Sequence, residues 1–225
     1  MKILKGNKFK GQINHNTLYL ITESDEIEFV EKQKDTEEED YVDVKFNLKN
    51  GQYAIFASEF RPNFLANSKK VDIFLLVVDE NERKCSSWIC DVKVSVGGKD
   101  VIEHLVAQWI ASYRHKCTLT NYLDEFSEKE TIAVITRNYQ ADRIQEIVEK
   151  LQKEIETLST TLNAMPKSSN IMNQQRNLLI MKKEYQMYND FQRGIVSIEG
   201  KDHPITIYKL EGEKTPYRCK MEVSC

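Results

Sequence analysis

Apolar residues along the chain follow two patterns, which predict strands in some segments and helices in others. Residues 71–78 and 88–96 are rich in Val, Ile, Leu and Phe on either side of a charged turn, a pattern typical of an antiparallel hairpin. Residues 41–56 predict a second hairpin around Asn50-Gly51, because Asn-Gly between alternating runs is a strong turn signal. Residues 131–136 predict one further strand.

Helical periodicity begins after Gly97-Gly98. Asp100 is the expected N-cap, and Glu103 follows three residues later as in a capping box. The apolar positions that follow form one broad face, and they are Val101, Ile102, Leu105, Val106, Trp109 and Ile110. We expect this helix to lie against the sheet and to end in the basic run Arg114-His115-Lys116.

Two later segments repeat apolar residues at spacings of three and four, the pattern of a coiled-coil seam. The first seam is Ile144, Val148, Leu151, Ile155, Leu158 and Leu162, and the second is Ile171, Gln174, Leu178, Met181, Tyr185 and Tyr188. A short connection containing Pro166 separates the seams, so residues 139–193 predict an antiparallel α-helical hairpin.

The two ends of the chain complete the predicted organisation. Residues 1–21 include a short strand, residues 22–40 an acidic exposed loop or frayed helix end, and residues 194–225 a small β element that completes the edge of the sheet. The fold class is therefore α+β. We expect one core made of residues 1–138 plus 194–225, with the helical arm of residues 139–193 inserted into it.

Composition limits the class of protein. The chain has 225 residues, of which 40% are hydrophobic and 30% charged, as in ordinary globular domains. Its longest apolar run is far shorter than the ~20 residues that span a bilayer, so we expect a cytoplasmic protein without a membrane partner. Residues 22–40 carry a net charge of −8 against −3 for the whole chain, which leaves a mildly basic body compatible with nucleic acid.

Charged residues inside the central hairpin are the candidate chemistry. If the turn is centred between Asn81 and Glu82, Asp72 lies directly opposite Asp91 and shares a face with Lys93. Opposed carboxylates repel, and burying them costs several kcal/mol unless a cation compensates. Mg²⁺ suits such a site, because it needs only one or two carboxylates besides water and substrate phosphate.

Two observations leave alternatives open. A turn centred on Asn81 alone would place Asp72 opposite Cys90 and separate the two carboxylates. Asp43-Val44-Lys45 is a second Asp-x-Lys sequence, but it has neither an opposed carboxylate nor a following amphipathic helix. We therefore favour Asp91 and Lys93.

The order of Asp72, then Asp91-Val92-Lys93 on the next strand, then a helix and another strand resembles the core of the PD-(D/E)xK nuclease superfamily. The resemblance covers about residues 58–137, and Val71 stands where the family has proline. It implies a restriction-endonuclease-like mixed sheet flanked by helices. It also implies an Mg²⁺ (or Mn²⁺) ion held by Asp72, Asp91 and the Val92 carbonyl, with Lys93 as the catalytic lysine.

The same resemblance suggests two further site residues. Glu59 is the nearest upstream acidic residue that could complete the metal shell. Gln108 on the following helix is similar to the Gln of RecB-like exonucleases, although Tyr113 follows it one residue later than their usual spacing.

These observations support two hypotheses from different classes. The first is a metal-dependent nuclease acting on DNA or RNA, which by resemblance suits the effector subunit of a bacterial restriction or anti-phage defence complex. The second is a non-catalytic scaffold whose helical hairpin docks a protein partner or self-associates. Phosphate-cradling glycine loops, Ser/His/Asp sets, HExxH and zinc-finger spacings do not occur in the sequence.

Overall fold

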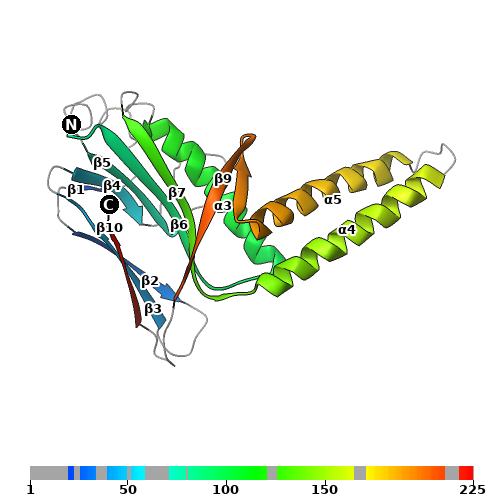
Figure 1. Cartoon of the computed structure of the whole chain (residues 1–225), viewed down its shortest axis with the longest axis horizontal. Coiled ribbons are helices and arrows are strands. Elements are labelled where there is room, and N and C mark those ends of the chain that lie inside the picture. Colours follow the sequence, from blue (N-terminus) through cyan, green and yellow to red (C-terminus); the bar gives the residue numbers. More distant parts are fainter. Residues whose placement is uncertain are drawn as a thin grey trace.

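The arrangement of the elements is seen in a computed structural model of the chain (Figure 1). The structure describes residues 20–22, 26–33, 40–49, 52–58, 71–79, 81–120, 126–164, 171–210 and 218–224. Within these residues the chain is a mixed α/β protein with two sheets and three helices. None of these helices is long and apolar enough to cross a membrane.

The larger sheet is mixed and has seven strands in the described part of the chain. In spatial order they are β1 (Leu20–Thr22), β4 (Gln52–Ser58), β5 (Ile73–Asp79), β6 (Lys84–Val96), β7 (Ser127–Tyr139), β9 (Lys201–Lys209) and β8 (Ile195–Ile198). The pairs β4–β5 and β5–β6 are antiparallel, whereas β6–β7 and β7–β9 are parallel. The predicted central hairpin and the predicted strand at 131–136 are therefore confirmed.

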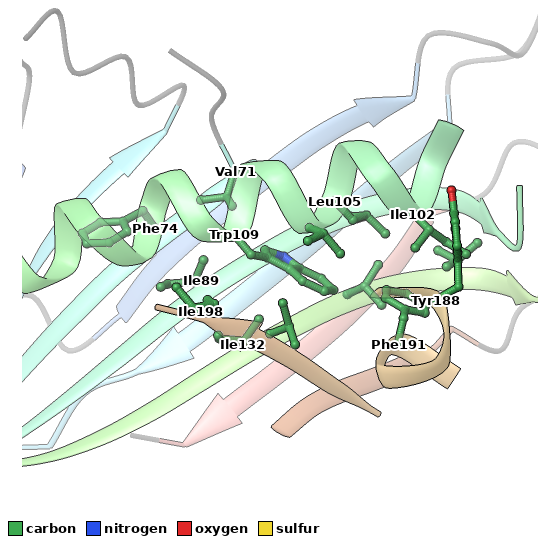
Figure 2. Packing of buried hydrophobic residues seen from close by; sticks show 14 of the residues in the cluster. Val71, Phe74, Ile89, Ile102, Leu105, Trp109, Ile132, Tyr188, Phe191 and Ile198 are labelled. Atoms are coloured by element: carbon green, nitrogen blue, oxygen red, sulfur yellow. The ribbon is translucent and has the colours of Figure 1, made fainter. Parts of the chain in front are cut away.

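The helix α3 (Lys99–Thr120) connects β6 to β7, as a parallel pair of strands requires. Its apolar face packs on the central strands, and the buried core there includes Phe74, Ile89, Leu105, Trp109 and Ile132 (Figure 2). This packing confirms the predicted amphipathic helix. Its first turn begins earlier than predicted, because the Ile102 amide donates to the Gly98 carbonyl and Asp100 lies inside the helix.

The smaller sheet covers the opposite face of the central strands. It consists of β2 (Glu26–Gln33), β3 (Asp40–Asn47) and β10 (Arg218–Ser224), with β3 in the middle. Val42, Val44 and Phe46 of β3 join Leu75 and Val77 of β5 in a second buried core. The central hairpin is thus buried on both faces, which explains its nearly continuous apolar sequence.

The predicted hairpin at 41–56 is wrong. The turn bond is present, since the Gln52 amide donates to the Lys49 carbonyl at 3.0 Å, but β3 and β4 do not pair. They belong to different sheets, because β3 pairs with β2 and β10 while β4 pairs with β1 and β5. The chain reverses so that the two strands contribute to facing layers, where the buried residues of β3 cover β5.

Two predictions for the ends of the chain are also corrected. Residues 26–33 form strand β2, antiparallel to β3, rather than a loop or helix end. The acidic residues there obscured a period of two, in which Ile27 and Phe29 pair with Phe46 and Val44. At the other end, the hairpin β8–β9 extends the larger sheet as predicted, but β10 joins the smaller sheet.

The arm consists of α4 (Ala141–Ala164) and α5 (Ile171–Gln192), which run side by side in opposite directions and project from the sheet (Figure 1). Its base is buried at Ile144, Val148, Leu151, Tyr188 and Phe191. The seam positions farther out are half-buried, while most of their neighbours on the helices are exposed. Their burial agrees with the predicted inward-facing sides of the two helices.

Candidate active site

The register of the central hairpin brings the predicted residues together. Ile73 pairs with Cys90, and Asp79 pairs with Lys84 at the turn. Asp72 directly precedes β5, and the next position of the same register is Asp91. The predicted turn between Asn81 and Glu82 is therefore correct, and the alternative that paired Asp72 with Cys90 is wrong.

One ammonium group joins the two carboxylates. Lys93 Nζ lies 3.0 Å from Asp72 Oδ2 and 3.2 Å from Asp91 Oδ1. The Val92 amide also donates to Asp72 Oδ2, at 2.8 Å, which fixes that side chain against β6. Asp91 has no exposed side-chain surface, whereas Asp72 and Lys93 are about one-fifth exposed. The three charged groups thus form a cluster with a net charge of −1 when all are ionised.

Burial dominates the electrostatics of this cluster. It raises the pKa of Asp91 to about 7, with the Lys93 ammonium acting in the opposite direction and the Asp72 carboxylate adding to the rise. Burial also acts to lower the pKa of Lys93, but its two carboxylate neighbours outweigh that effect and raise it. Lys93 therefore stays charged at neutral pH while Asp91 is poised to lose or take up a proton.

The oxygens of this cluster suit a hard divalent cation. Among the described residues, the buried Asp91 Oδ2 has no hydrogen-bond partner, although a buried carboxylate oxygen normally has one. Because one ammonium contacts both carboxylates, their bonded oxygens are at most about 6 Å apart. In the described ranges, no three His, Cys, Asp or Glu side chains converge as metal ligands. The two carboxylates of Asp72 and Asp91 therefore suit Mg²⁺, which keeps several waters, better than a metal ion that is held entirely by side chains.

Helix α3 covers the face of the sheet on which the cluster lies. Trp109 is fully buried there, and its indole N–H helps to lower the pKa of Asp91 without completing an ordinary hydrogen bond. The sequence placed Trp109 on the apolar face but gave no sign of a role at the site. Gln108, the preceding residue, is 5% exposed on the same helix, and its predicted role remains a prediction.

The other predicted site residues differ in what the structure shows of them. Glu59 lies outside the described residues. Val92 points its side chain into the core on the far face of the sheet, and its amide contacts Asp72. The predicted role of its carbonyl as a metal ligand remains a prediction.

A buried lysine corrects the predicted basic end of α3. Lys116 is 3% exposed and contacts Glu128 Oε1 at 2.6 Å and Glu130 Oε2 at 2.5 Å. Glu130 also binds His203 Nδ1 at 2.6 Å, so this cluster joins α3, β7 and β9. His115 is buried as well, with its ring 5.9 Å from that of Phe74. The predicted basic end of the helix is therefore wrong, because both residues are buried and α3 continues beyond them to Thr120.

No protein-family model matches the chain, and no curated protein or solved structure is significantly similar to it.

Proposed function

We propose that the protein is a metal-dependent nuclease that hydrolyses phosphodiester bonds in DNA or RNA. The observation that carries the proposal is the meeting of Asp72, Asp91 and Lys93 around a buried carboxylate oxygen that has no hydrogen-bond partner in the described part of the chain. Two acidic ligands and an adjacent lysine are the groups that metal-assisted hydrolysis of a phosphodiester needs.

The order of the elements also supports the proposal. An antiparallel hairpin, β5–β6, is followed by the crossing helix α3 and then by β7, which is parallel to β6. This is the order expected from the resemblance to the PD-(D/E)xK nucleases. On this proposal the larger sheet is a restriction-endonuclease-like core, and the arm is a coiled-coil hairpin inserted into it.

Each residue of the cluster has a distinct role. Asp72 and Asp91 hold the cation, with the Val92 carbonyl and Glu59 as further ligands by resemblance. When bound, the cation polarises the scissile phosphate and lowers the pKa of a bound water. Lys93 orients that water and offsets negative charge that develops on the phosphate. Gln108 on α3 belongs to the site by the same resemblance.

The net charge of the cluster explains how it accommodates both a cation and a phosphate. Lys93 balances only one of the two carboxylates, so an Mg²⁺ ion converts a site of net charge −1 to one of +1. A site of that sign attracts the phosphodiester backbone. Binding of nucleic acid should then rest mainly on phosphate contacts and weaken steeply with salt.

Cleavage assays on single- and double-stranded DNA and RNA test the proposal. We expect Mg²⁺- or Mn²⁺-dependent cleavage that EDTA and Lys93→Ala each abolish. Lys45→Ala is the matched control, because Lys45 belongs to the other Asp-x-Lys sequence, in the smaller sheet. Equal cleavage by wild type and Lys93→Ala would end the catalytic assignment.

The arm supports a second candidate function, that of a scaffold which docks a protein partner. Met172, Leu179 and Ile180 are 76%, 56% and 47% exposed, and all three lie on α5. They are spaced along one side of the helix, away from the seam, where apolar side chains have no role in the fold. The same arm on a nuclease suits the effector subunit of a bacterial restriction or anti-phage defence complex. The scaffold function would be favoured if the wild-type protein has no nuclease activity and Leu179→Glu abolishes binding of its protein partner.

A further inference from the structure

We infer that Lys209, the last residue of β9, is a binding residue for the nucleic acid substrate and contacts a backbone phosphate near the scissile one. The inference rests on the proposed function, because it concerns the same substrate. It extends the site from the cluster of Asp72, Asp91 and Lys93 across two further strands of the larger sheet.

The register of the parallel strands places Lys209 in line with the cluster. Lys93 on β6 pairs with Thr136 on β7, and Thr136 pairs with Lys209 on β9, so β7 lies between the two lysines (Figure 1). Neighbouring strands are about 4.8 Å apart, which puts the Cα atoms of Lys93 and Lys209 about 10 Å apart. Along one strand of B-DNA, phosphates follow each other about every 3.4 Å of helix axis, so this separation corresponds to about three nucleotides.

Lys209 also lies on the same face of the sheet as the cluster. Paired residues of neighbouring strands point to the same face, and side chains alternate along each strand. Ile207, two residues before Lys209, packs against the core that α3 covers, whereas Tyr208 packs against the core under the smaller sheet. On β6, Asp91 precedes Val92, which belongs to that second core. Lys209 and the cluster therefore share the face that α3 covers.

The ammonium group of Lys209 is held in place but not neutralised. It lies over the ring of Tyr139, the last residue of β7, with Nζ 5.6 Å from the ring centroid. Lys209 is exposed, and no carboxylate in the described part of the chain pairs with it. By contrast, Lys99 at the start of α3 is paired with Glu184. An exposed cation that already rests on an aromatic ring loses little side-chain freedom when it contacts a phosphate.

The edge of the sheet on which Lys209 lies suits a ligand. The strands β6, β7 and β9 are parallel, and ligands of open α/β sheets bind outside the carboxyl ends of such strands. Lys93 lies three residues before the end of β6, and Lys209 ends β9. Thr136, which lies between them, is fully buried and donates its hydroxyl proton to the Val94 carbonyl at 3.2 Å. The two lysines are therefore the charged groups of this row.

Binding of short fluorescein-labelled DNA and RNA, each single- and double-stranded, to the full chain tests the inference. Fluorescence anisotropy in EDTA measures Kd over a range of KCl concentrations without the cation that cleavage needs. Lys209→Met keeps the apolar stem over Tyr139 but removes the charge. Because each phosphate contact adds about 0.7–0.9 to the slope of log Kd against log salt, this variant should lose about that much slope and about five- to eightfold in affinity at about 0.1 M KCl.

Two control variants show whether the effect belongs to the charge of Lys209. Lys209→Arg keeps the charge and can still stack on Tyr139, so it should retain the wild-type slope. Lys201→Met removes an exposed lysine at the other end of β9, roughly 26 Å away along the strand, and should bind within about twofold of wild type.

The outcomes separate the inference from the proposed function. A wild-type salt slope in Lys209→Met, or an equal loss in Lys201→Met, overturns the inference, while Mg²⁺-dependent cleavage by wild type leaves the nuclease proposal standing. If the loss is specific to Lys209→Met but wild type cleaves nothing with Mg²⁺ or Mn²⁺, the nuclease proposal fails and the phosphate contact stands. Wild type that binds none of the four nucleic acids overturns both.

Discussion

Two buried residues should change the free energy of unfolding in opposite directions as the pH rises from 4 to 7, so that their effects on stability nearly cancel in the wild type. Burial raises the pKa of Asp91 to about 7, so the folded state holds a proton there that the unfolded state has lost. Burial lowers the pKa of His115 to about 4, so the unfolded state there binds a proton that the folded state does not.

The sign of each effect follows from proton linkage. The Asp91 contribution is fully present below the unfolded pKa of 3.8 and is lost as the pH rises through about 7. The His115 contribution is fully present above the unfolded pKa of 6.5 and is lost as the pH falls toward about 4. At 1.36 kcal/mol per pKa unit, the two amount to about 4 and about 3 kcal/mol in the free energy of unfolding.

Single substitutions separate the two contributions. Asp91→Asn cannot ionise, so only the His115 contribution remains, and the free energy of unfolding of this variant should rise by about 3 kcal/mol as the pH increases from 4 to 6.5. His115→Gln should show the reverse, a fall of about 4 kcal/mol between pH 4 and 7. The wild type should stay nearly level.

Urea unfolding in EDTA, followed by circular dichroism at half-unit steps of pH, measures these slopes. Asp142→Asn is the control, because Asp142 is an exposed carboxylate in the first turn of α4. The reasoning fails if the wild type, Asp91→Asn and His115→Gln have parallel profiles. It also fails if Asp91→Asn changes the profile no more than the control does.

Two further predictions concern packing near the beginning of α3. Gly97→Ala should destabilise the protein by about 1–3 kcal/mol in urea unfolding, because a Cβ at position 97 would lie 2.5 Å from Gln140 Cβ. Gly98→Ala is the control and should be the milder change, because the nearest atom to a Cβ at position 98 is 3.9 Å away. Tyr188→Phe should cost about 1 kcal/mol in thermal or urea unfolding, since the hydroxyl loses its bond to α3, and an unchanged midpoint would contradict that bond.

The sequence predicted the candidate site better than it predicted the sheets. The register of Asp72 and Asp91 depends only on a short charged turn and the period of two, both of which are local. By contrast, Asn50-Gly51 predicts that the chain reverses, but not whether β3 and β4 then pair or face each other. That choice depends on β5, whose second apolar face needs a covering layer.

The long-range contacts of α3 are harder to find in a sequence. Trp109 is one of several apolar residues on the buried face of α3, and its contact with Phe191 joins positions far apart in the chain. Likewise, Lys116 in a basic run looks like a solvated helix end. Its burial depends on two glutamates of β7 that no local pattern connects to it.

Lys93 and Lys116 lead to a last prediction, which distinguishes a cation site from a structural ion pair. Each lysine bridges two carboxylates, but the Lys116 partners are 35% and 16% exposed, whereas Asp91 is fully buried with one oxygen unpartnered among the described residues. Lys93→Met and Lys116→Met should each destabilise the metal-free protein at pH 8, by about 3–5 kcal/mol in urea unfolding.

Mg²⁺ should then affect the two variants differently. It can take the place of the Lys93 charge, so at a hundred times its Kd it should return about 2.7 kcal/mol to Lys93→Met. Lys116→Met should gain no more than wild type does, because its carboxylates reach water and leave no buried oxygen that requires a cation. If Mg²⁺ stabilises Lys93→Met no more than it stabilises wild type and Lys116→Met at the same concentration, Mg²⁺ does not take the place of the lysine charge, and the distinction between the two clusters would be lost.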